Sequence, residues 1–350
     1  MDRKRVAVIF GGCSTEYEVS LQSASAVMEQ LDPEKYETIW IGITRAGKWF
    51  RYYGTTESIR GNTWWEETEN CRPVTLCMDR EEKSLIEWVS GVTSRVKVDV
   101  AFPVLHGKNG EDGTIQGAFA MAGIPVAGCG VLSSALCMDK DRAHKLVSLA
   151  GVRVPESVVF YEPVSENVLR EKTAHLKYPL FVKPVKAGSS FGITKIRRPS
   201  ELKRAVETAF FHDGEVIVEE NIDGFEVGCA VLGKRTLLAG EVDEIELSEG
   251  FFDYVEKYTL KTSRIHMPAR IDSETRRRIR EEAVKIYRTL GCVGFARVDM
   301  FLTPEKEIVF NEVNTIPGCT SHSRYPNMMK GIGVDFCEML TRVIESSLED

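Results

Sequence analysis

Short apolar segments alternate with amphipathic ones along the first part of the chain. Val6–Phe10 is an uninterrupted apolar run that ends at Gly11 and Gly12, and Thr38–Ile43 is a second, largely apolar run. Continuous rather than alternating apolarity is typical of strands that are buried on both faces of a parallel sheet. Glu18–Leu31, between the two runs, has apolar residues at helical spacing. This order predicts a βαβ unit and therefore an open α/β sheet.

The rest of the pattern predicts further short strands and a few helices. The predicted strands are Val98–Leu105, Val158–Tyr161, Tyr178–Lys183, Val216–Glu220, Val227–Leu232, Thr236–Glu241, Phe295–Phe301 and Ile308–Glu312. The predicted helices are Lys140–Ala150, Glu274–Leu290 and Val334–Ile344. Residues 51–83 are polar, weakly periodic and rich in Trp and Glu, so they are interpreted as an insertion.

Composition narrows the class of protein. With 350 residues, of which 43% are hydrophobic, the chain is long enough for two or three modules of roughly 100–200 residues each. The formal net charge is −7 and both signs are interspersed, which argues against a nucleic-acid or anionic-membrane partner. The nine cysteines include no C-x-x-C pair, as expected for reduced, mostly buried thiols. Because the first apolar run is too short for a signal peptide or a membrane span, we expect a soluble, cytoplasmic protein.

The last two predicted strands carry the clearest candidate chemistry. Arg297 and Asp299 alternate with apolar residues, so both polar side chains leave the same face of one strand. Glu312 and Asn314 do the same at the end of the next strand. Two carboxylates and an amide oxygen from neighbouring strands form an all-oxygen set that suits Mg²⁺ held between protein and phosphates. The alternative reading is a pair of solvated strand faces.

Glycine-rich loops supply a second group of candidates. Gly318 lies in a turn where backbone N–H groups could approach a ligand closely, and Lys183 precedes a Gly-Ser-Ser loop that could bind phosphate. His106 opens another such loop after a strand, where ligands of open α/β sheets bind. Each has a structural alternative. Lys140 is equally an exposed helical lysine, His106 a buried structural histidine, and Glu16 a residue that supports a helix N-terminus.

Taken in order, these segments resemble the D-alanine–D-alanine ligase family of the ATP-grasp superfamily. The resemblance runs nearly from end to end, and residues 51–83 contribute least to it. The matching motifs are Gly11-Gly12-x-Ser14-x-Glu16-x-Glu18-Val19-Ser20, His106-Gly-x-x-Gly110-Glu-Asp-Gly113, Met138-Asp-Lys140, Lys183-Pro-x-x-x-Gly-Ser-Ser190, Asp253-Tyr254-x-x-Lys257-Tyr258, Arg297-x-Asp299, Asn311-Glu312-x-Asn314-Thr-x-Pro-Gly318-x-Thr320 and Ser321-x-Ser323.

The resemblance implies a mixed α/β chain with the ATP-grasp fold. An N-terminal domain at 1–137, with a Rossmann-like open parallel sheet, would precede a central lid at 138–215. A C-terminal domain at 216–350, with a mobile loop at 249–261, would complete the grasp. The implied reaction consumes ATP with Mg²⁺ or Mn²⁺, as two ions. It transfers the γ-phosphate to a first D-alanine and lets a second D-amino acid attack the acylphosphate, giving a dipeptide for peptidoglycan precursors. A homodimer is also implied.

The resemblance also implies roles for individual residues. The residues implied in catalysis are Glu16, Ser189, Tyr258, Arg297, Gly318 and Ser323. Those implied in ATP binding are Lys140, Lys183, Ser190, Glu219, Glu220, Glu226 and Lys257. The implied metal ligands are Asp299, Glu312 and Asn314, and the implied substrate-binding residues are His106, Asp243, Phe252, Ser323 and Arg324. Arg297 and the Gly318 N–H would stabilise the developing oxyanion.

Three residues bear on the second substrate. Tyr258, after a lysine, argues against the D-lactate-forming branch of the family. Arg324 and Phe252 resemble the D-alanine–D-serine ligases of the vancomycin-resistance type, and Arg324 could hydrogen-bond a serine hydroxyl. We therefore expect D-serine as acceptor, with a housekeeping D-alanine–D-alanine ligase as the alternative. A catalytically inactive nucleotide-binding regulator with the same fold is the alternative from another class.

Overall fold

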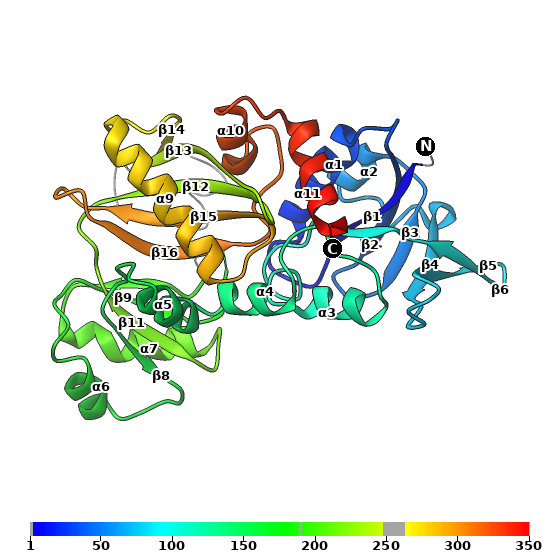
Figure 1. Cartoon of the computed structure of the whole chain (residues 1–350). Helices are drawn as coiled ribbons and strands as arrows, with labels where there is room; N and C mark the ends of the chain where they lie inside the picture. Colours follow the sequence, from blue (N-terminus) through cyan, green and yellow to red (C-terminus); the bar gives the residue numbers. More distant parts are fainter. Residues whose placement is uncertain (1–2, 189–190, 248–262, 350) are drawn as a thin grey trace.

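The described residues form three β-sheets (Figure 1). The computed structural model describes residues 3–188, 191–247 and 263–349. The first sheet has seven strands, the second four and the third five. In Figure 1 the first sheet lies on the right, and the third and second lie one above the other on the left.

The seven-stranded sheet is built from the N-terminal part of the chain. Its strands are β1 (Lys4–Gly11), β2 (Tyr36–Ile43), β3 (Trp49–Tyr52), β4 (Cys71–Leu76), β5 (Ser84–Val89), β6 (Val92–Lys97) and β7 (Val100–Pro103). The helices in this part are α1 (Tyr17–Gln30), α2 (Thr56–Arg60), α3 (Thr114–Met121) and the 3-10 turn η1 (Thr68–Asn70). The strand order is β6-β5-β4-β3-β2-β1-β7, and β1 pairs in parallel with both β2 and β7. The predicted parallel sheet is therefore present at β2-β1-β7, and four antiparallel strands extend it.

The continuous apolar run in β1 is explained by its two covered faces. Val6, Val8 and Phe10 pack in one core cluster with α1 and with the C-terminal helix α11 (Phe336–Leu348). Ala7 and Ile9 point to the other face and belong to a cluster that includes Phe119 of α3. Because successive side chains of a strand alternate between faces, both faces are apolar here.

Residues 51–83, interpreted from sequence as a polar insertion, are an ordered part of the first sheet. This stretch forms half of β3, all of β4 and the helix α2, and it is hydrogen-bonded into that sheet. Trp64 within it is fully buried, and its ring lies only 2.4 Å from the position that a Cβ atom on Gly42 would occupy. The sequence looks polar because these strands are short and most of their residues are only half-buried or exposed.

The four-stranded sheet lies in the middle of the sequence. Its strands are β8 (Ser157–Phe160), β9 (Leu180–Pro184), β10 (Thr194–Ile196) and β11 (Val216–Glu220), in the order β10-β9-β11-β8. The helices in this part are α6 (Glu166–Lys172), α7 (Leu202–Phe210) and the 3-10 turn η2 (Pro199–Glu201). Residues 216–220 were assigned by sequence to the C-terminal domain. The structure places them here, because β11 pairs with β8 and β9 along its length.

The five-stranded sheet is antiparallel and has helices on both faces. Its strands are β12 (Phe225–Gly233), β13 (Leu237–Leu247), β14 (Ser263–His266), β15 (Gly294–Leu302) and β16 (Ile308–Asn314), in the order β14-β13-β12-β15-β16. Helix α9 (Ser273–Thr289) covers one face, and α10 (Arg324–Lys330) with α11 covers the other. Helices α4 (Val131–Met138) and α5 (Lys140–Leu149) contact β16.

Two of the three sheets share a hydrophobic core, and the remaining one has a core of its own. One hydrophobic cluster runs from Val8 of the first sheet to Phe295 of the third, with α11 between them. The residues of the four-stranded sheet form a separate cluster, which includes Val182 and Val218. The first and third sheets therefore share one hydrophobic core, and the middle sheet has its own. Among the described residues, no helix is long and apolar enough to cross a membrane.

The aromatic cluster around Trp64 gives a stability prediction. Trp64 stacks edge-on against Phe10 and Tyr52 and donates a hydrogen bond to the Tyr17 hydroxyl at 3.0 Å. We expect Trp64→Ala to destabilise the fold by about 3–5 kcal/mol, because it empties a large buried volume. Chemical denaturation followed by circular dichroism measures this. The matched control is Trp65→Ala, whose 48% exposed ring predicts a change within about 0.5 kcal/mol. Equal shifts for the two variants would contradict the buried position of Trp64.

Candidate active site

A cavity of about 530 Å³ lies where the N-terminal part meets the third sheet. Glu111 and His106 line it from the glycine-rich loop after β7, and Arg324 lines it from the start of α10. We call it the amino-acid cavity. The residues predicted from sequence that line it are Glu16, His106, Lys140, Arg297, Glu312, Asn314, Gly318, Ser323 and Arg324. The fold thus brings residues between positions 16 and 324 of the sequence together around one cavity.

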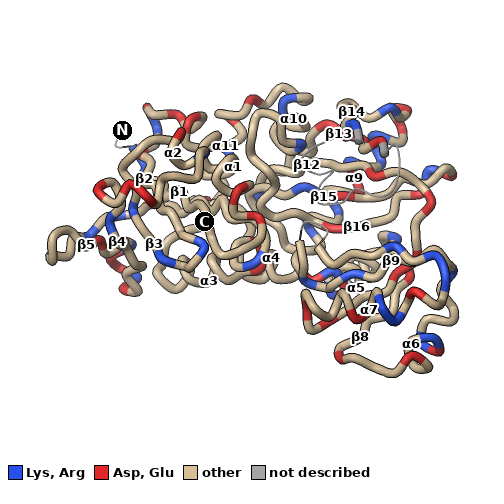
Figure 2. The backbone as a smooth tube through the Cα atoms, turned by 180° about the vertical axis from the view of Figure 1, so that it is seen from behind, with Lys and Arg blue, Asp and Glu red and all other residues tan. Residues whose placement is uncertain are grey.

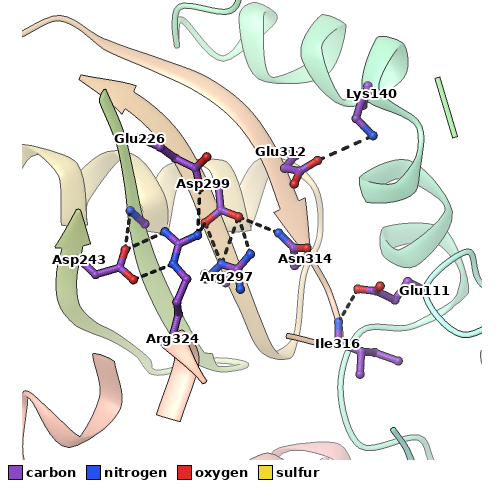
Figure 3. Close-up of polar contacts among 11 residues, drawn as sticks. Glu111, Lys140, Glu226, Asp243, Arg297, Asp299, Glu312, Asn314, Ile316 and Arg324 are labelled. Atoms are coloured by element: carbon purple, nitrogen blue, oxygen red, sulfur yellow. Dashed lines mark hydrogen bonds and ion pairs between the residues drawn. The ribbon is translucent and has the colours of Figure 1, made fainter. Parts of the chain in front are cut away.

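The alternation along β15 and β16 brings the predicted polar residues together. Arg297 pairs in register with Asn314, and Asp299 with Glu312. Arg297 donates to both oxygens of Asp299, with its Nη2 at 2.7 Å from Oδ2, and the Asn314 amide donates to Oδ2 at 2.8 Å (Figure 3). Asp299 is only 1% exposed, so its charge depends on these donors for compensation.

Arg324 lies at the centre of a buried ion network. Its Nε and Nη2 each donate to Asp243 at 2.7 Å, and its Nη1 donates to Glu226 at 2.9 Å (Figure 3). Nη1 also lies 3.4 Å from Oδ1 of Asp299. Burial opposes the charge of Arg324, but the Asp243, Asp299 and Glu226 carboxylates outweigh it and raise the pKa of Arg324 well above its usual value. Arg324 therefore stays charged within the wall of the cavity.

Asp243, predicted as a substrate-site residue that orients Arg324, contacts Arg324 but does not itself line the amino-acid cavity. It is 1% exposed, both of its oxygens accept hydrogen bonds from Arg324, and it does not line the amino-acid cavity. Its Oδ1 also accepts the Gly228 N–H at 3.1 Å. Asp243 thus binds the Arg324 guanidinium without lining the cavity, and it orients this side chain.

The donor set on β15 and β16 fits a hard divalent cation that is shared with phosphates. Asp299 and Glu312, which are paired in register, and Asn314, two residues after Glu312, offer oxygen ligands. The described residues contain no group of three or more acidic, His or Cys side chains placed to hold a metal by themselves. Mg²⁺ is usually held by one or two carboxylates together with substrate phosphates, so a partial protein site is what this chemistry requires.

A second cavity of about 410 Å³ separates the second and third sheets. We call it the nucleotide cavity. Phe181, Ile222 and Phe301 contribute apolar walls, as a purine ring requires. The residues predicted to bind ATP that line it are Lys140, Lys183, Glu219, Glu220 and Glu226.

Basic residues of the nucleotide cavity are held by acidic partners. Lys183 forms an ion pair with Glu219, and both side chains are nearly buried. The Lys140 ammonium donates to the Ala187 carbonyl at 2.9 Å and lies 3.7 Å from Glu312 (Figure 3). Lys140, Ala187 and Glu312 line both cavities, so the cavities meet at these residues.

The sequence left two readings of His106, and the contacts support the structural one. Its Nδ1 donates to the Ile316 carbonyl at 2.9 Å and its Nε2 lies 3.1 Å from the Ser23 hydroxyl. Burial lowers the pKa of His106, which favours the neutral ring. Both ring nitrogens thus have protein partners, although the ring lines the amino-acid cavity.

Glu16 packs where two glycines leave room for it. A Cβ atom on Gly107 would lie 2.4 Å from the Glu16 carboxylate, and one on Gly188 would lie 3.1 Å from it. The backbone therefore approaches this acidic group from two loops. Gly318 is packed in the same manner, because an added Cβ would lie 3.0 Å from the Ser323 hydroxyl.

Some predicted residues fall outside the described part of the chain, and others were missed. Those outside it are Ser189, Ser190, Phe252, Lys257 and Tyr258. Glu111 belongs to the His106–Gly113 motif, but the sequence analysis predicted no function for it. Its position as a carboxylate in a glycine-rich loop is a signal that could have indicated one. Ser23 carries no such signal, because a serine within an amphipathic helix is ordinary.

Comparison with known proteins agrees with this geometry. Family models described as the N-terminus and the C-terminus of D-ala D-ala ligase match residues 5–129 and 146–345. A D-alanine–D-alanine ligase from Caldicellulosiruptor bescii is 40% identical, over all of this chain and 96% of its own length. The vancomycin B-type resistance protein VanB from Enterococcus faecalis is 43% identical over the full length of both chains.

A solved structure gives a similar result. The crystal structure of the VanG D-Ala:D-Ser ligase from Enterococcus faecalis superposes with a TM-score of 0.92 and 63% sequence identity, over 99% of this chain and 100% of that one. Fold and site together define an ATP-dependent ligase with the ATP-grasp fold. More particularly, the chain belongs to the D-alanine–D-alanine ligase family, and the predicted family, fold class and enzyme class are confirmed.

The buried Arg324–Asp243 pair gives a second stability prediction. We expect Arg324→Leu to cost about 3–5 kcal/mol, because Asp243 would stay buried without its bidentate partner. Adding Asp243→Asn to this variant should restore part of the loss, which a denaturation series on the three variants would measure. The control is Arg342→Leu, because the Arg342–Glu338 pair is about half exposed and should contribute less than about 1 kcal/mol. A similar loss for both single variants would argue against the buried network.

Proposed function

We propose that this protein joins D-alanine to a second D-amino acid, with D-serine as the acceptor, at the expense of ATP. The dipeptide would enter peptidoglycan precursors, as in the vancomycin-resistance type of ligase. The observation that carries the proposal is the meeting of the two cavities at Lys140, Ala187 and Glu312. A nucleotide in one cavity and an amino-acid carboxylate in the other can exchange a phosphoryl group only at such a junction.

The proposed first step is phosphoryl transfer to the carboxylate of D-alanine. Lys140 and Lys183 would pair with phosphate oxygens, and Glu226 would accept from the ribose hydroxyls. Asp299, Glu312 and Asn314 would hold Mg²⁺ or Mn²⁺, as two ions, which would neutralise charge on the phosphates. Glu16 would pair with the ammonium of the first D-alanine. Enclosure of the site keeps water from the acylphosphate that forms.

The proposed second step is attack by the acceptor amine on the acylphosphate carbonyl. Arg297 and the Gly318 N–H would stabilise the oxyanion, since both line the amino-acid cavity. Ser323, whose hydroxyl accepts the Thr320 N–H at 3.0 Å, would hold the acceptor carboxylate. Phosphate then leaves from the tetrahedral intermediate.

Two observations support D-serine as the acceptor. The VanG D-Ala:D-Ser ligase is similar over the whole chain, at 63% identity. Arg324 lines the amino-acid cavity with a charged guanidinium that Asp243 orients, and a serine hydroxyl needs such a polar partner in a closed pocket. A housekeeping D-alanine–D-alanine ligase is the alternative, and its acceptor would leave that partner unused.

The argument against D-lactate as acceptor depends on Tyr258. Homodimerisation stays a prediction from the family resemblance.

Competition between acceptors tests the proposal. Purified protein with ATP, Mg²⁺ and D-alanine should release phosphate faster with D-serine than with a second D-alanine, when compared as kcat/KM. Mass spectrometry of the product should show D-alanyl-D-serine. A kcat/KM for D-alanine equal to or above that for D-serine would make it a housekeeping ligase. A depsipeptide from D-lactate would contradict the amine acceptor.

The role of Arg324 gives a sharper prediction. Arg324→Leu should lower kcat/KM for D-serine more than for D-alanine, by roughly 5- to 150-fold, which corresponds to about 1–3 kcal/mol for an unpaired hydroxyl. The ratio of the two acceptors within one preparation cancels any loss of folded protein. Lys330→Gln, which removes an exposed charge from the far end of the same helix, should leave the ratio unchanged. An equal fall for both acceptors would show that Arg324 does not discriminate.

A further inference from the structure

The turn from Ile316 to Cys319 is held by side chains of the N-terminal part. The Ile316 N–H donates to Oε1 of Glu111 at 3.0 Å (Figure 3), and the Ile316 carbonyl accepts from Nδ1 of His106 at 2.9 Å. The Cys319 N–H donates to the Ser23 hydroxyl at 3.4 Å. Backbone groups on both sides of Gly318 are therefore bound by residues about 200–300 positions earlier in the chain.

The hydrogen-bond directions in this cluster are mutually consistent. The Ile316 carbonyl can only accept, so Nδ1 of His106 carries the proton and Nε2 accepts from the Ser23 O–H at 3.1 Å. The Ser23 oxygen then remains an acceptor for Cys319. Ser23 and His106 are 1% and 5% exposed, so these groups rely on one another rather than on water.

Glu111 connects this turn to its own loop. While Oε1 accepts from Ile316, Oε2 accepts the Gly107 N–H at 3.0 Å. Only a carboxylate can accept from both N–H groups at once, because an amide would turn its NH₂ toward one of them. The carboxylate form is costly here, because burial, followed by the nearby charge of Glu16, raises the pKa of Glu111 to about 7.

We propose that Glu111 is a positioning residue, which with His106 and Ser23 clamps the Ile316–Cys319 turn so that the Gly318 N–H faces the reacting carbonyl. The inference rests on the proposed role of Gly318 as an oxyanion donor. The shared apolar core brings the first and third sheets together, but apolar contacts are not directional. The directed hydrogen bonds of the clamp set the distance, and a misplacement of about 1 Å can lower a rate on the order of 100-fold.

Glu111→Gln and Asp112→Asn form a matched pair of variants. Asp112 is the next residue of the same loop and also accepts two backbone N–H groups, from Asn109 at 2.8 Å and Thr114 at 3.0 Å. Both of those groups belong to its own loop. We expect Glu111→Gln to lower kcat roughly 10- to 100-fold with the KM for ATP within about twofold of wild type. Asp112→Asn should keep kcat within about threefold of wild type.

Hydrogen exchange measures the clamp without substrates. In Glu111→Gln the backbone amide of Ile316 should exchange faster, while the same amide in Asp112→Asn should match wild type. Ser23→Ala, which removes the contact to Cys319, provides an independent variant and should lower kcat, referred to folded protein, roughly 3- to 10-fold with the KM for ATP within about twofold of wild type. An unchanged kcat in Glu111→Gln, equal losses in the matched pair, or unaltered exchange at Ile316 would overturn the proposal. Failure of the proposed function would look different, because wild-type protein would form no ADP on addition of D-alanine.

Discussion

The mutual neutralisation of buried charges is the constraint on which this site depends. Asp299 and Asp243 are both 1% exposed, and each would be strongly destabilising without a cationic partner. Arg297 and Arg324 supply that compensation, and both guanidinium groups reach Asp299. Asp299 and Arg324 are thus parts of one network. A change at Arg324 must therefore affect both the wall of the amino-acid cavity and the electrostatics at Asp299.

The arrangement of the cores determines how substrates can be enclosed. The first and third sheets share a hydrophobic cluster, which makes the amino-acid cavity between them a largely preformed space. The four-stranded sheet has its own cluster and covers the nucleotide cavity. Because few apolar contacts tie it to the rest, its position is the one that ligand binding can most readily change. Basic residues (Lys, Arg) and acidic residues (Asp, Glu) are interspersed over all three sheets, as Figure 2 shows from behind.

The sequence predicted many of the strands and helices, and the elements that it did not predict were missed for physical reasons. The buried parallel strands were recognised because their apolar runs are uninterrupted, and the helix α1 because its apolar residues recur at helical spacing. The strands between 49 and 97 were missed because each has only four to six residues, and most of these residues are half-buried or exposed. Strand β11 was recognised as a strand but assigned to the wrong sheet, because apolar periodicity does not encode the strand's neighbours.

The sequence by itself determined which side chains leave the same face of a strand and where glycines permit close approach. Arg297 and Asp299 follow from the two-residue period of a strand, and so do Glu312 and Asn314. Only the tertiary structure decided that Arg324 also pairs with Glu226, and that Glu111 holds Ile316. Side-chain periodicity is a property of a few neighbouring residues, whereas contacts across the cavity depend on how separate sheets pack around shared cores.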